Sequence, residues 1–488
     1  MIFDDEIVKQ WQEEALKHPN ILYWKQATDN KGANAIDGCV KELRNKSNYY
    51  IETGIIPTLD ASATIVKSDM LIQVGLRAEL QKAFNKLKAG QGSKLNWRPN
   101  SNEQMLDLVH SSMYPLVYGR TGVLQDEVVG TTDAIDKWAG KGQRIAKETS
   151  PIHRDADSLP ASLWSDTYQW LPANVKFMED GTVKFTSYIN NLHPQKYPHI
   201  YRSIEKLIEA ALPTWDQCLS LSLERGTKMG AGRTEPRFPK QDLKTRKPVH
   251  PSVPEFKDIE YAPRDTARLA HKFKKTGLQV VVKIASIELA PEKPEFPAEE
   301  WHVQTWFERT HGTSLVDGTC LQIYGTVQMH EGRLLTFPNV FQQRESSIKL
   351  RDPSKTGSRH LISLQLVDPN ARIISTANVP PQQHDWWASA VFGQSLQSDS
   401  AALAKFPSDL VAILQQKGFV KDSRISGRKL PVELLHMVRA HLYNTESCMP
   451  MSEEEAQKHR AELLTERIEH HVRADLARSN RVYYIFLG

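Results

Sequence analysis

The residue types with the clearest chemical potential lie in two stretches of the second half of the chain. WHVQ (301–304) falls in a predicted strand, where the two-residue period places His302 and Gln304 on one face. Further along come Gln343, in FPNVFQQRES, and Arg359, at the start of another predicted strand. An imidazole transfers protons near neutral pH or binds metals, and a guanidinium pairs with carboxylate or phosphate. These four side chains form the candidate site.

The order of these residues resembles the facial triad of non-haem Fe(II), 2-oxoglutarate oxygenases, which use His-x-Asp/Glu, a distal His and an Arg that pairs with 2-oxoglutarate. His302 and Arg359 have counterparts in that pattern. Gln304 stands at the carboxylate position and Gln343 at the distal His position. Fe(II) prefers anionic or imidazole ligands, so two neutral amides argue against a working iron centre. We expect no metal and no other cofactor.

Longer stretches carry a more specific resemblance. The chain resembles, almost end to end, a fungal family with a domain of unknown function that is related to these oxygenases. Many of its members have WHVE and FQHR where this chain has WHVQ and FQQR. The matching stretches cover much of 65–390: VKSDMLI, LDLVHSSMYPLVYGRT, YQWLPANVKF, FTSYINNLHP, WHVQ, EGRLLTFPNVFQQR and RIISTANVPPQQHDWW.

Within that family, the chain is similar to the branch of arginine-containing cyclodipeptide synthases. The resemblance implies an aminoacyltransferase that joins arginine from arginyl-tRNA to a second aminoacyl group and releases a diketopiperazine, a secondary metabolite, without ATP or metal. Charged tRNAs would be its partners. Two alternatives stay open: an oxygenase with degenerate ligands, and a non-catalytic pseudo-oxygenase that binds a partner.

If the chain is such a synthase, His302 is the best candidate for the base, although a core histidine retained after metal loss is an equal alternative. Gln304 and Gln343 would bind an ester carbonyl or a terminal base, or merely fill space. Arg359 would bind a carboxylate or phosphate, or pair with an acid such as Asp352. SYINNLHP adds four candidates for a cavity wall or, as the simpler alternative, for a helix entry: Tyr188, Asn190, Asn191 and His193.

A basic segment is the candidate for tRNA contact. Residues 224–275 contain 14 Lys and Arg against 7 Asp and Glu, although the whole chain carries only +4. Lys and Arg without apolar periodicity suit the phosphate backbone of a nucleic acid, and a solvated surface loop is the alternative. The predicted tRNA-binding residues lie in its densest part: Arg233, Arg237, Lys240, Lys244, Arg246 and Lys247.

The composition of the 488 residues, 40% hydrophobic and 25% charged, is typical of a globular protein and excludes a fibrous or disordered one. No apolar run approaches the length of a membrane helix, and the acidic, amphipathic N-terminus is not a secretory signal. Four widely spaced cysteines exclude a disulfide scaffold and suggest reduced thiols, so we expect a cytoplasmic protein.

The hydrophobic pattern predicts a β-barrel-like core wrapped by N- and C-terminal helices, and the resemblance implies that this α+β fold has a double-stranded β-helix core, cupin- or jelly-roll-like. The expected divisions are 1–95 (helical), 96–380 (core, with an inserted helix and the basic loop 224–275) and 381–488 (helical). An Asp180-Gly181 hairpin is predicted in 174–188, followed by a helix that ends at Pro213. Residues 97–165 are expected to be irregular. Short β-branched runs predict strands at 278–289, 300–306, 320–327, 333–338, 360–368 and 371–376.

Overall fold

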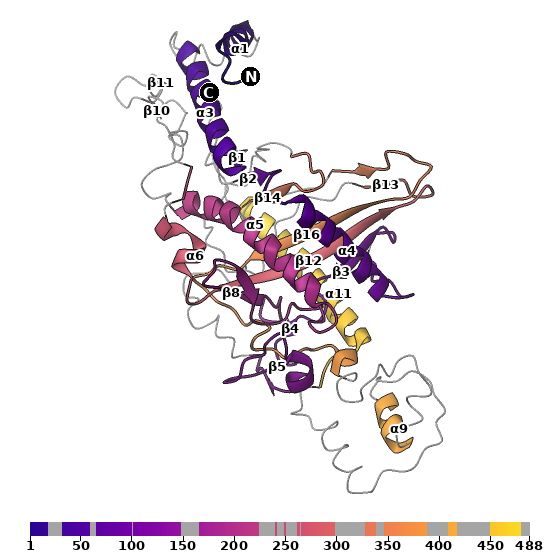
Figure 1. Cartoon of the computed structure of the whole chain (residues 1–488). Helices are drawn as coiled ribbons and strands as arrows, with labels where there is room; N and C mark the ends of the chain where they lie inside the picture. The colour runs from indigo at the N-terminus through magenta and orange to yellow at the C-terminus, as the bar shows by residue number, and fades with distance from the viewer. Residues whose placement is uncertain are drawn as a thin grey trace. The chain divides into compact units, whose positions relative to one another are not determined.

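The computed structural model (Figure 1) divides the chain into two compact units. The first unit comprises Met1–Ala78, Leu207–Lys272 and Gln322–Pro338, and the second comprises Glu79–Lys206, Phe273–Leu321 and Asn339–Gly488. Among the residues that the structure describes, no helix is long and apolar enough to cross a membrane. The described residues are 1–17, 32–58, 65–99, 101–147, 165–223, 240–241, 248–249, 261–263, 265–297, 327–337, 346–387, 408–416 and 449–479.

A curled antiparallel sheet is the centre of the second unit (Figure 1). Its middle strand, β12 (Leu278–Leu289), pairs with β16 (Gly357–Leu366) along one edge. Along its other edge β12 pairs with β8 (Ala173–Phe177) and with β3 (Met105–Val109). Ten of the twelve residues of β12 are buried, as expected for a β-branched strand covered on both faces. The strand predicted at 278–289 is confirmed.

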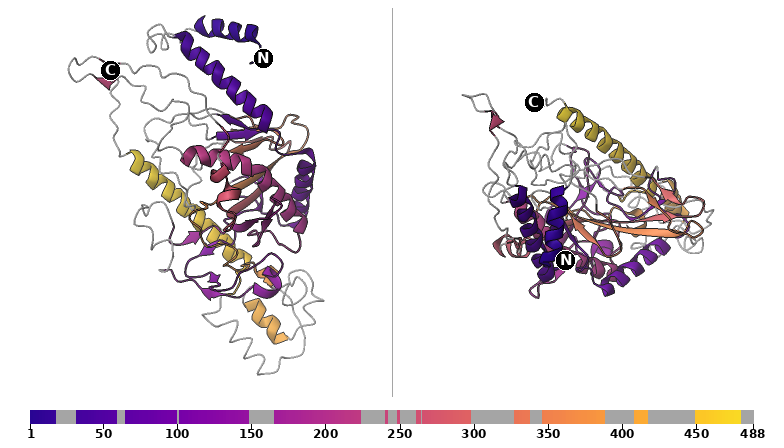
Figure 2. Two further views of the ribbon diagram at one scale, coloured as in Figure 1. Left: turned by 60° about the vertical axis from the view of Figure 1, so that its left-hand side comes forward. Right: turned by 90° about the horizontal axis from the view of Figure 1, so that it is seen from above.

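Helices cover both faces of this sheet (Figure 2). On one face, Phe84 of α4 (Val74–Gly90) stacks on His360 of β16 with ring centroids 4.2 Å apart. Helix α5 (Pro198–Leu223) lies beside α4 on that face, and Glu205 accepts a hydrogen bond from the backbone of Phe185. On the opposite face, Leu463 of α11 (Glu453–Ser479) belongs to the same apolar cluster as Val281 of β12.

The hairpin predicted around Asp180-Gly181 is confirmed. Strands β8 and β9 (Val183–Phe185) pair antiparallel, and Gly181 has a φ of +83°, a conformation that favours glycine. The Asp180 carboxylate accepts hydrogen bonds from the backbone N–H and the hydroxyl of Thr182. The helix that follows does not end at Pro213, because α5 continues to Leu223. Packing overrides the proline here, since Trp215 and Cys218 beyond it are buried.

Two other predictions about strands are wrong. Residues 97–165 are not merely irregular, because all five residues of β3 are buried in the sheet. Residues 371–376 do not form a strand: the side chain of Gln279 bonds to both the N–H and the C=O of Ile373, which replaces a ladder partner. The other described elements of the second unit are short, apart from α9: β4 (Leu116–Val117), β5 (Gly122–Val123), η1 (Ala134–Trp138), β6 (Gln143–Arg144), β7 (Tyr168–Gln169), β13 (Glu295–Phe296), β15 (Ile348–Lys349) and α9 (Ser408–Gln416).

The first unit combines helices with a small antiparallel sheet of order β1-β2-β14. The strand predicted at 333–338 is confirmed as β14, and that predicted at 360–368 as part of β16. The strands predicted at 300–306 and 320–327 lie outside the described residues, apart from Val327, which is not in a strand. The elements of this unit, besides parts of α4 and α5, are α1 (Asp5–Lys17), α3 (Gly32–Thr53), β1 (Ile56–Thr58), β2 (Ile65–Ser68), β10 (Lys240–Gln241), β11 (Pro248–Val249), η6 (Asp265–Ala267), α6 (Leu269–Lys272) and β14 (Leu334–Thr336).

The chain is thus a mixed α/β protein built on a curled antiparallel sheet with flanking helices. The division at 1–95, 96–380 and 381–488 stays a prediction.

Asp216 makes the stability of the first unit depend on pH. Its side chain is 8% exposed and Oδ1 accepts the N–H of Leu269 at 2.7 Å. Burial raises the pKa of Asp216 to about 6, although the Leu269 N–H and Arg268 oppose the rise. A raised native pKa means that stability is fully present below about pH 4 and is lost as the pH rises through 6.

We expect Asp216→Asn to remove this loss, because the amide oxygen keeps the Leu269 bond without titrating. Unfolding by urea between pH 4.5 and 8 should show the variant gaining about 2–3 kcal/mol over the wild type across that range. Asp216→Ala is the control, since it also stops titrating but loses the hydrogen bond. If the difference in free energy of unfolding between wild type and Asp216→Asn does not change with pH, Asp216 is not the source of the pH dependence.

Candidate functional site

The structure describes only part of the site predicted from the sequence. His302, Gln304 and Gln343 lie outside the described residues. Arg359 is described: it is half-buried on β16 and pairs in register with Ile287 of β12. The carboxylate of Asp352, its suggested structural partner, binds Lys355 at 3.1 Å. Of the predicted tRNA-binding residues only Lys240 is described, as part of the β10–β11 pair; Arg233, Arg237, Lys244, Arg246 and Lys247 lie outside.

The four candidates from SYINNLHP bind neighbouring chain segments. The Tyr188 hydroxyl is fully buried and donates to the C=O of Val379 at 2.9 Å. The ring of His193 packs on Trp386 with centroids 4.9 Å apart. Asn190 and Asn191 donate to backbone carbonyls of a loop formed by residues 110–114. These side chains therefore position other parts of the second unit.

This loop, His110–Tyr114, is held from two directions. Asn191 Nδ2 donates to the C=O of His110 at 2.8 Å and of Met113 at 2.7 Å. Gln383 Nε2 in turn donates to Oδ1 of Asn191 at 2.8 Å. LDLVHSSMYPLVYGRT, FTSYINNLHP and RIISTANVPPQQHDWW, which are far apart in the sequence, thus meet around one loop. The network fixes the backbone that carries His110.

His110 lies on the same face of the sheet as Asp107, Lys283 and Arg359. The strand pairing shows this directly: Asp107 is opposite Ala285, and Lys283 is opposite Ser363, with side chains of paired residues on one face. Val109 pairs with Ile284, so His110 follows at the position of Lys283, whose charge acts on the imidazole. This is the face covered by α11. We call Asp107, His110 and Lys283 the inner-face cluster.

Asp107 is the buried anion of the cluster. Arg98 donates to Oδ1 at 2.9 Å and Arg460 of α11 donates to Oδ2; Asp107 is 0% and Arg460 1% exposed. Burial alone raises the pKa of Asp107, but His110 in its protonated form, Arg98 and Arg460 outweigh it and hold the pKa below its usual value. Asp107 is therefore an ionised carboxylate at neutral pH. It is shared by two guanidinium groups.

The His110 imidazole is neutral and has a defined tautomer. Burial, opposed by Asp107 and assisted by the charge of Lys283, lowers its pKa well below the usual value. Nδ1 accepts the backbone N–H of Ser112 at 3.2 Å, so the ring hydrogen of the neutral form is on Nε2. Within the described part of the chain no side chain accepts a hydrogen bond from Nε2, and the residue as a whole is partly exposed.

Lys283 brings a cation to the same face. Its ammonium lies 3.6 Å from the ring centroid of Trp170, and the guanidinium of Arg467 lies 4.1 Å from the same centroid. The indole thus orders two cations beside the cluster. A neutral N–H donor and an ammonium on the same face of the sheet suit an oxygen atom that gains negative charge. The described residues contain no group of three His, Cys, Asp or Glu placed to hold a metal.

Sequence patterns alone did not identify Asp107, His110 or Lys283 as candidate site residues. A signal for the first two was present, because both lie in LDLVHSSMYPLVYGRT, one of the stretches that carry the family resemblance. Lys283 gave no signal, since a lysine inside an apolar strand has no motif of its own. Only the pairing of β12 with β3 and β16 brings the three together.

One protein family matches the chain. Its model covers residues 33–306 and 304–390 and is described as "Protein of unknown function (DUF4246)". The matches span well over half of the sequence, so the chain belongs to this family. No curated protein and no solved structure matches the chain significantly.

Proposed function

We propose that this chain is a tRNA-dependent cyclodipeptide synthase that joins arginine from arginyl-tRNA to a second aminoacyl group. The starting point is the resemblance of its long sequence stretches to the arginine-containing branch of the family. We further propose that the curled sheet belongs to a double-stranded β-helix, to which the predicted strand with WHVQ would contribute. The enzyme would act in the cytoplasm, where charged tRNAs are formed.

The observation that carries the proposal is the pair of donors on the inner face, the Nε2–H of His110 and the ammonium of Lys283. Attack of an amine on an ester produces a tetrahedral intermediate with a negatively charged oxygen. Fixed donors on a sheet stabilise that charge without reorganising, which is the largest single contribution in many acyl-transfer enzymes. Three of the stretches that carry the resemblance meet at this loop, which supports a shared role.

The reaction balances without an added energy source, because both aminoacyl esters are already activated. The α-amine of one aminoacyl group attacks the ester carbonyl of the other; a C–N bond forms and the C–O bond to the ribose breaks. The amine proton passes to a base and then to the leaving ribose oxygen. A second attack, by the free amine on the remaining ester, closes the ring and releases the second tRNA.

The residues predicted from the sequence take the remaining roles. His302 is the proposed base. His110 does not suit this role, because its Nε2 carries the ring hydrogen and its Nδ1 accepts the N–H of Ser112. Gln304 and Gln343 would bind the ester carbonyl or the terminal adenine. Arg359 shares the inner face and would bind a phosphate of the acceptor end. The basic segment 224–275 would contact the tRNA backbone.

The oxygenase alternative requires an iron site that these residues do not fit. His302, Gln304 and Gln343 provide one imidazole and two neutral amides, whereas Fe(II) selects imidazole and carboxylate. The discriminating experiment incubates the purified protein with labelled arginyl-tRNA and, separately, with Fe(II) and 2-oxoglutarate. We expect the label to leave arginyl-tRNA only when a second charged tRNA is present. Succinate formation with intact arginyl-tRNA would overturn the proposal in favour of the oxygenase.

A further inference from the structure

A second cationic surface lies on the other face of the sheet, on helices α4 and α5. Its exposed side chains are Lys82 and Lys86 of α4, Lys196 just before α5, and His199, Arg202 and Lys206 of α5. We call these six residues the α4–α5 surface. All of them belong to the second unit.

Contacts between the two helices bring these residues onto one surface. Glu79 of α4 accepts hydrogen bonds from Ser203 at 3.1 Å and from Lys206 at 2.8 Å of α5. About two turns after Glu79 on α4, Lys86 lies close enough to His199 of α5 for its charge to lower the pKa of that imidazole. The helices therefore run antiparallel side by side, as Figure 1 shows, and their exposed stripes adjoin.

The surface has no role in packing the core. The opposite face of α4 is buried through Ala83, Phe84 and Leu87, and α5 is buried through Ile200 and Ile204. His199, Arg202 and Lys206 recur at the spacing of one exposed helix face. Removing their charges should therefore leave the fold intact.

The positive charges of the surface are only partly neutralised. Lys206 pairs with Glu79, whereas Lys82, Lys86, Lys196 and Arg202 form no ion pair with a carboxylate of the described residues. Lys86 and Lys196 both lie near the ring of Tyr197, at 6.0 and 5.2 Å from its centroid. Burial and the charge of Lys86 lower the pKa of His199. Cations held this close repel one another, and a polyanion would relieve that repulsion.

From this geometry we infer that the α4–α5 surface binds the sugar–phosphate backbone of tRNA; the inference rests on the proposed function. The reaction needs two tRNAs of different sequence, and contacts with phosphates position a nucleic acid without reading its bases. An anionic membrane fits less well, because none of the exposed large apolar side chains of the described residues lies on this surface.

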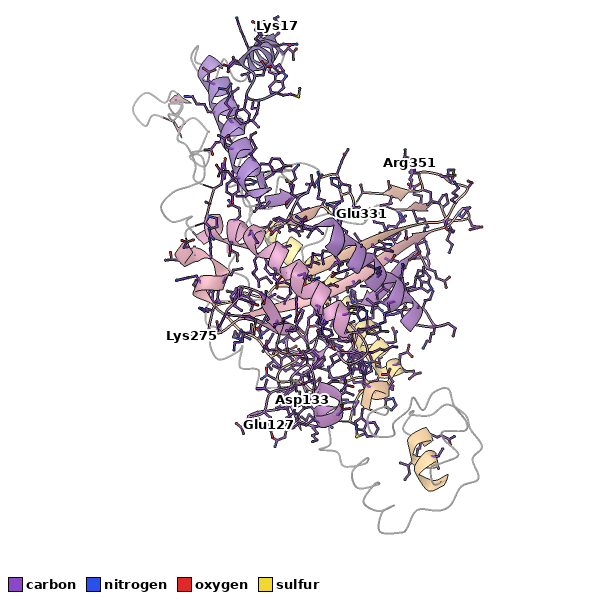
Figure 3. The ribbon with its side chains drawn as sticks, viewed as in Figure 1. Lys17, Glu127, Asp133, Lys275, Glu331 and Arg351 are labelled. Atoms are coloured by element: carbon purple, nitrogen blue, oxygen red, sulfur yellow. The ribbon has the colours of Figure 1, made fainter. Side chains whose placement is uncertain are left out.

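The test measures binding of uncharged bulk tRNA by the full-length protein. The variant Lys82→Glu/Lys86→Glu/Arg202→Glu reverses three charges of the surface. Its control, Arg144→Glu/Lys147→Glu/Arg351→Glu, changes the net charge equally at exposed positions of the same unit, outside the segment 224–275; Figure 3 labels Arg351, which lies between β15 and β16. Circular dichroism and thermal unfolding establish that both variants fold.

We expect the surface variant to bind tRNA at least 30-fold more weakly at 100 mM salt, and the control within about threefold of wild type. The slope of log K against log salt should fall by about 2, since each lost phosphate contact contributes roughly 0.7–0.9. Equal tRNA affinity of the two variants would overturn the inference. So would loss of binding to phosphatidylserine vesicles in the surface variant with tRNA affinity unchanged.

Product release and tRNA affinity together distinguish a wrong assignment of the α4–α5 surface from a wrong proposed function. If the wild type releases a cyclic dipeptide and the surface variant does so with the same KM for arginyl-tRNA, the surface assignment falls and the function stands. If the wild type makes no product but loses tRNA affinity specifically in the surface variant, the surface stands and the proposed reaction falls.

Discussion

Replacing Asp107 with Asn is expected to lower the free energy of unfolding by about 3–5 kcal/mol. The change preserves shape but removes the carboxylate that accepts a hydrogen bond from Arg460, whose side chain is 1% exposed. Arg460 then becomes a buried cation without a carboxylate partner among the described residues, and Arg98 loses the same carboxylate. Because Arg460 belongs to α11 and Asp107 to β3, the loss also weakens the docking of this helix on the sheet.

Urea unfolding at pH 7 measures this effect. The matched control is Glu79→Gln, which removes a carboxylate from the exposed pair with Lys206 and should cost about 0–1 kcal/mol. The pKa of Asp107 is lowered in the folded protein, so its contribution is present above about pH 4 and is lost as the pH falls through the native pKa. The difference between wild type and Asp107→Asn should therefore shrink in acid. A loss below 1 kcal/mol at pH 7 would contradict the buried pair.

His110→Ala carries the second large effect, on the rate of the proposed reaction. Removal of one fixed donor to a developing oxyanion typically lowers kcat by about 100–1000-fold, and we expect a loss in this range with KM for arginyl-tRNA little changed. The reason is the neutral imidazole of His110, which carries its hydrogen on Nε2 and belongs to the inner face of the sheet. Release of cyclic dipeptide under saturating charged tRNA is the measured quantity.

Two further variants make this result specific. His110→Gln retains an N–H donor and should recover part of the rate. His360→Ala removes a histidine from the opposite face of the same sheet, where it stacks on Phe84, and should leave kcat unchanged. Equal losses in His110→Ala and His360→Ala would indicate damage to the sheet and would remove His110 from the reaction.

Local sequence patterns predicted those strands and turns in which the spacing of the residues along the chain by itself determines the structure. The β-branched run 278–289 is β12, and the Asp-Gly turn joins β8 to β9. Ser452 and Glu455 have the spacing of a helix cap, and the Ser452 hydroxyl accepts a hydrogen bond from the N–H of Glu455 at the start of α11. The failures arise where distant residues intervene: the Gln279 side chain replaces a ladder bond for Ile373, and buried residues beyond Pro213 keep α5 helical.

The same distinction applies to the candidate site. The sequence singled out Asn190 and Asn191, and in the structure Asn191 donates to the backbone C=O of His110 and Asn190 to those of Met113 and Tyr114 in the same loop. His110 and Lys283 are 173 positions apart in the sequence, and only the non-local pairing of β3 with β12 makes them neighbours. That pairing of strands cannot be deduced from a single sequence without the structure.

The most direct measurement of the central claim is mass spectrometry of small molecules released by the purified protein from a pool of charged tRNAs with labelled arginine. A parallel sample is treated with ribonuclease. The proposed synthase predicts a labelled cyclic dipeptide whose mass identifies the second residue and which disappears after ribonuclease treatment. No such product, with folded protein and verified charged tRNA for all twenty amino acids, would contradict the claim.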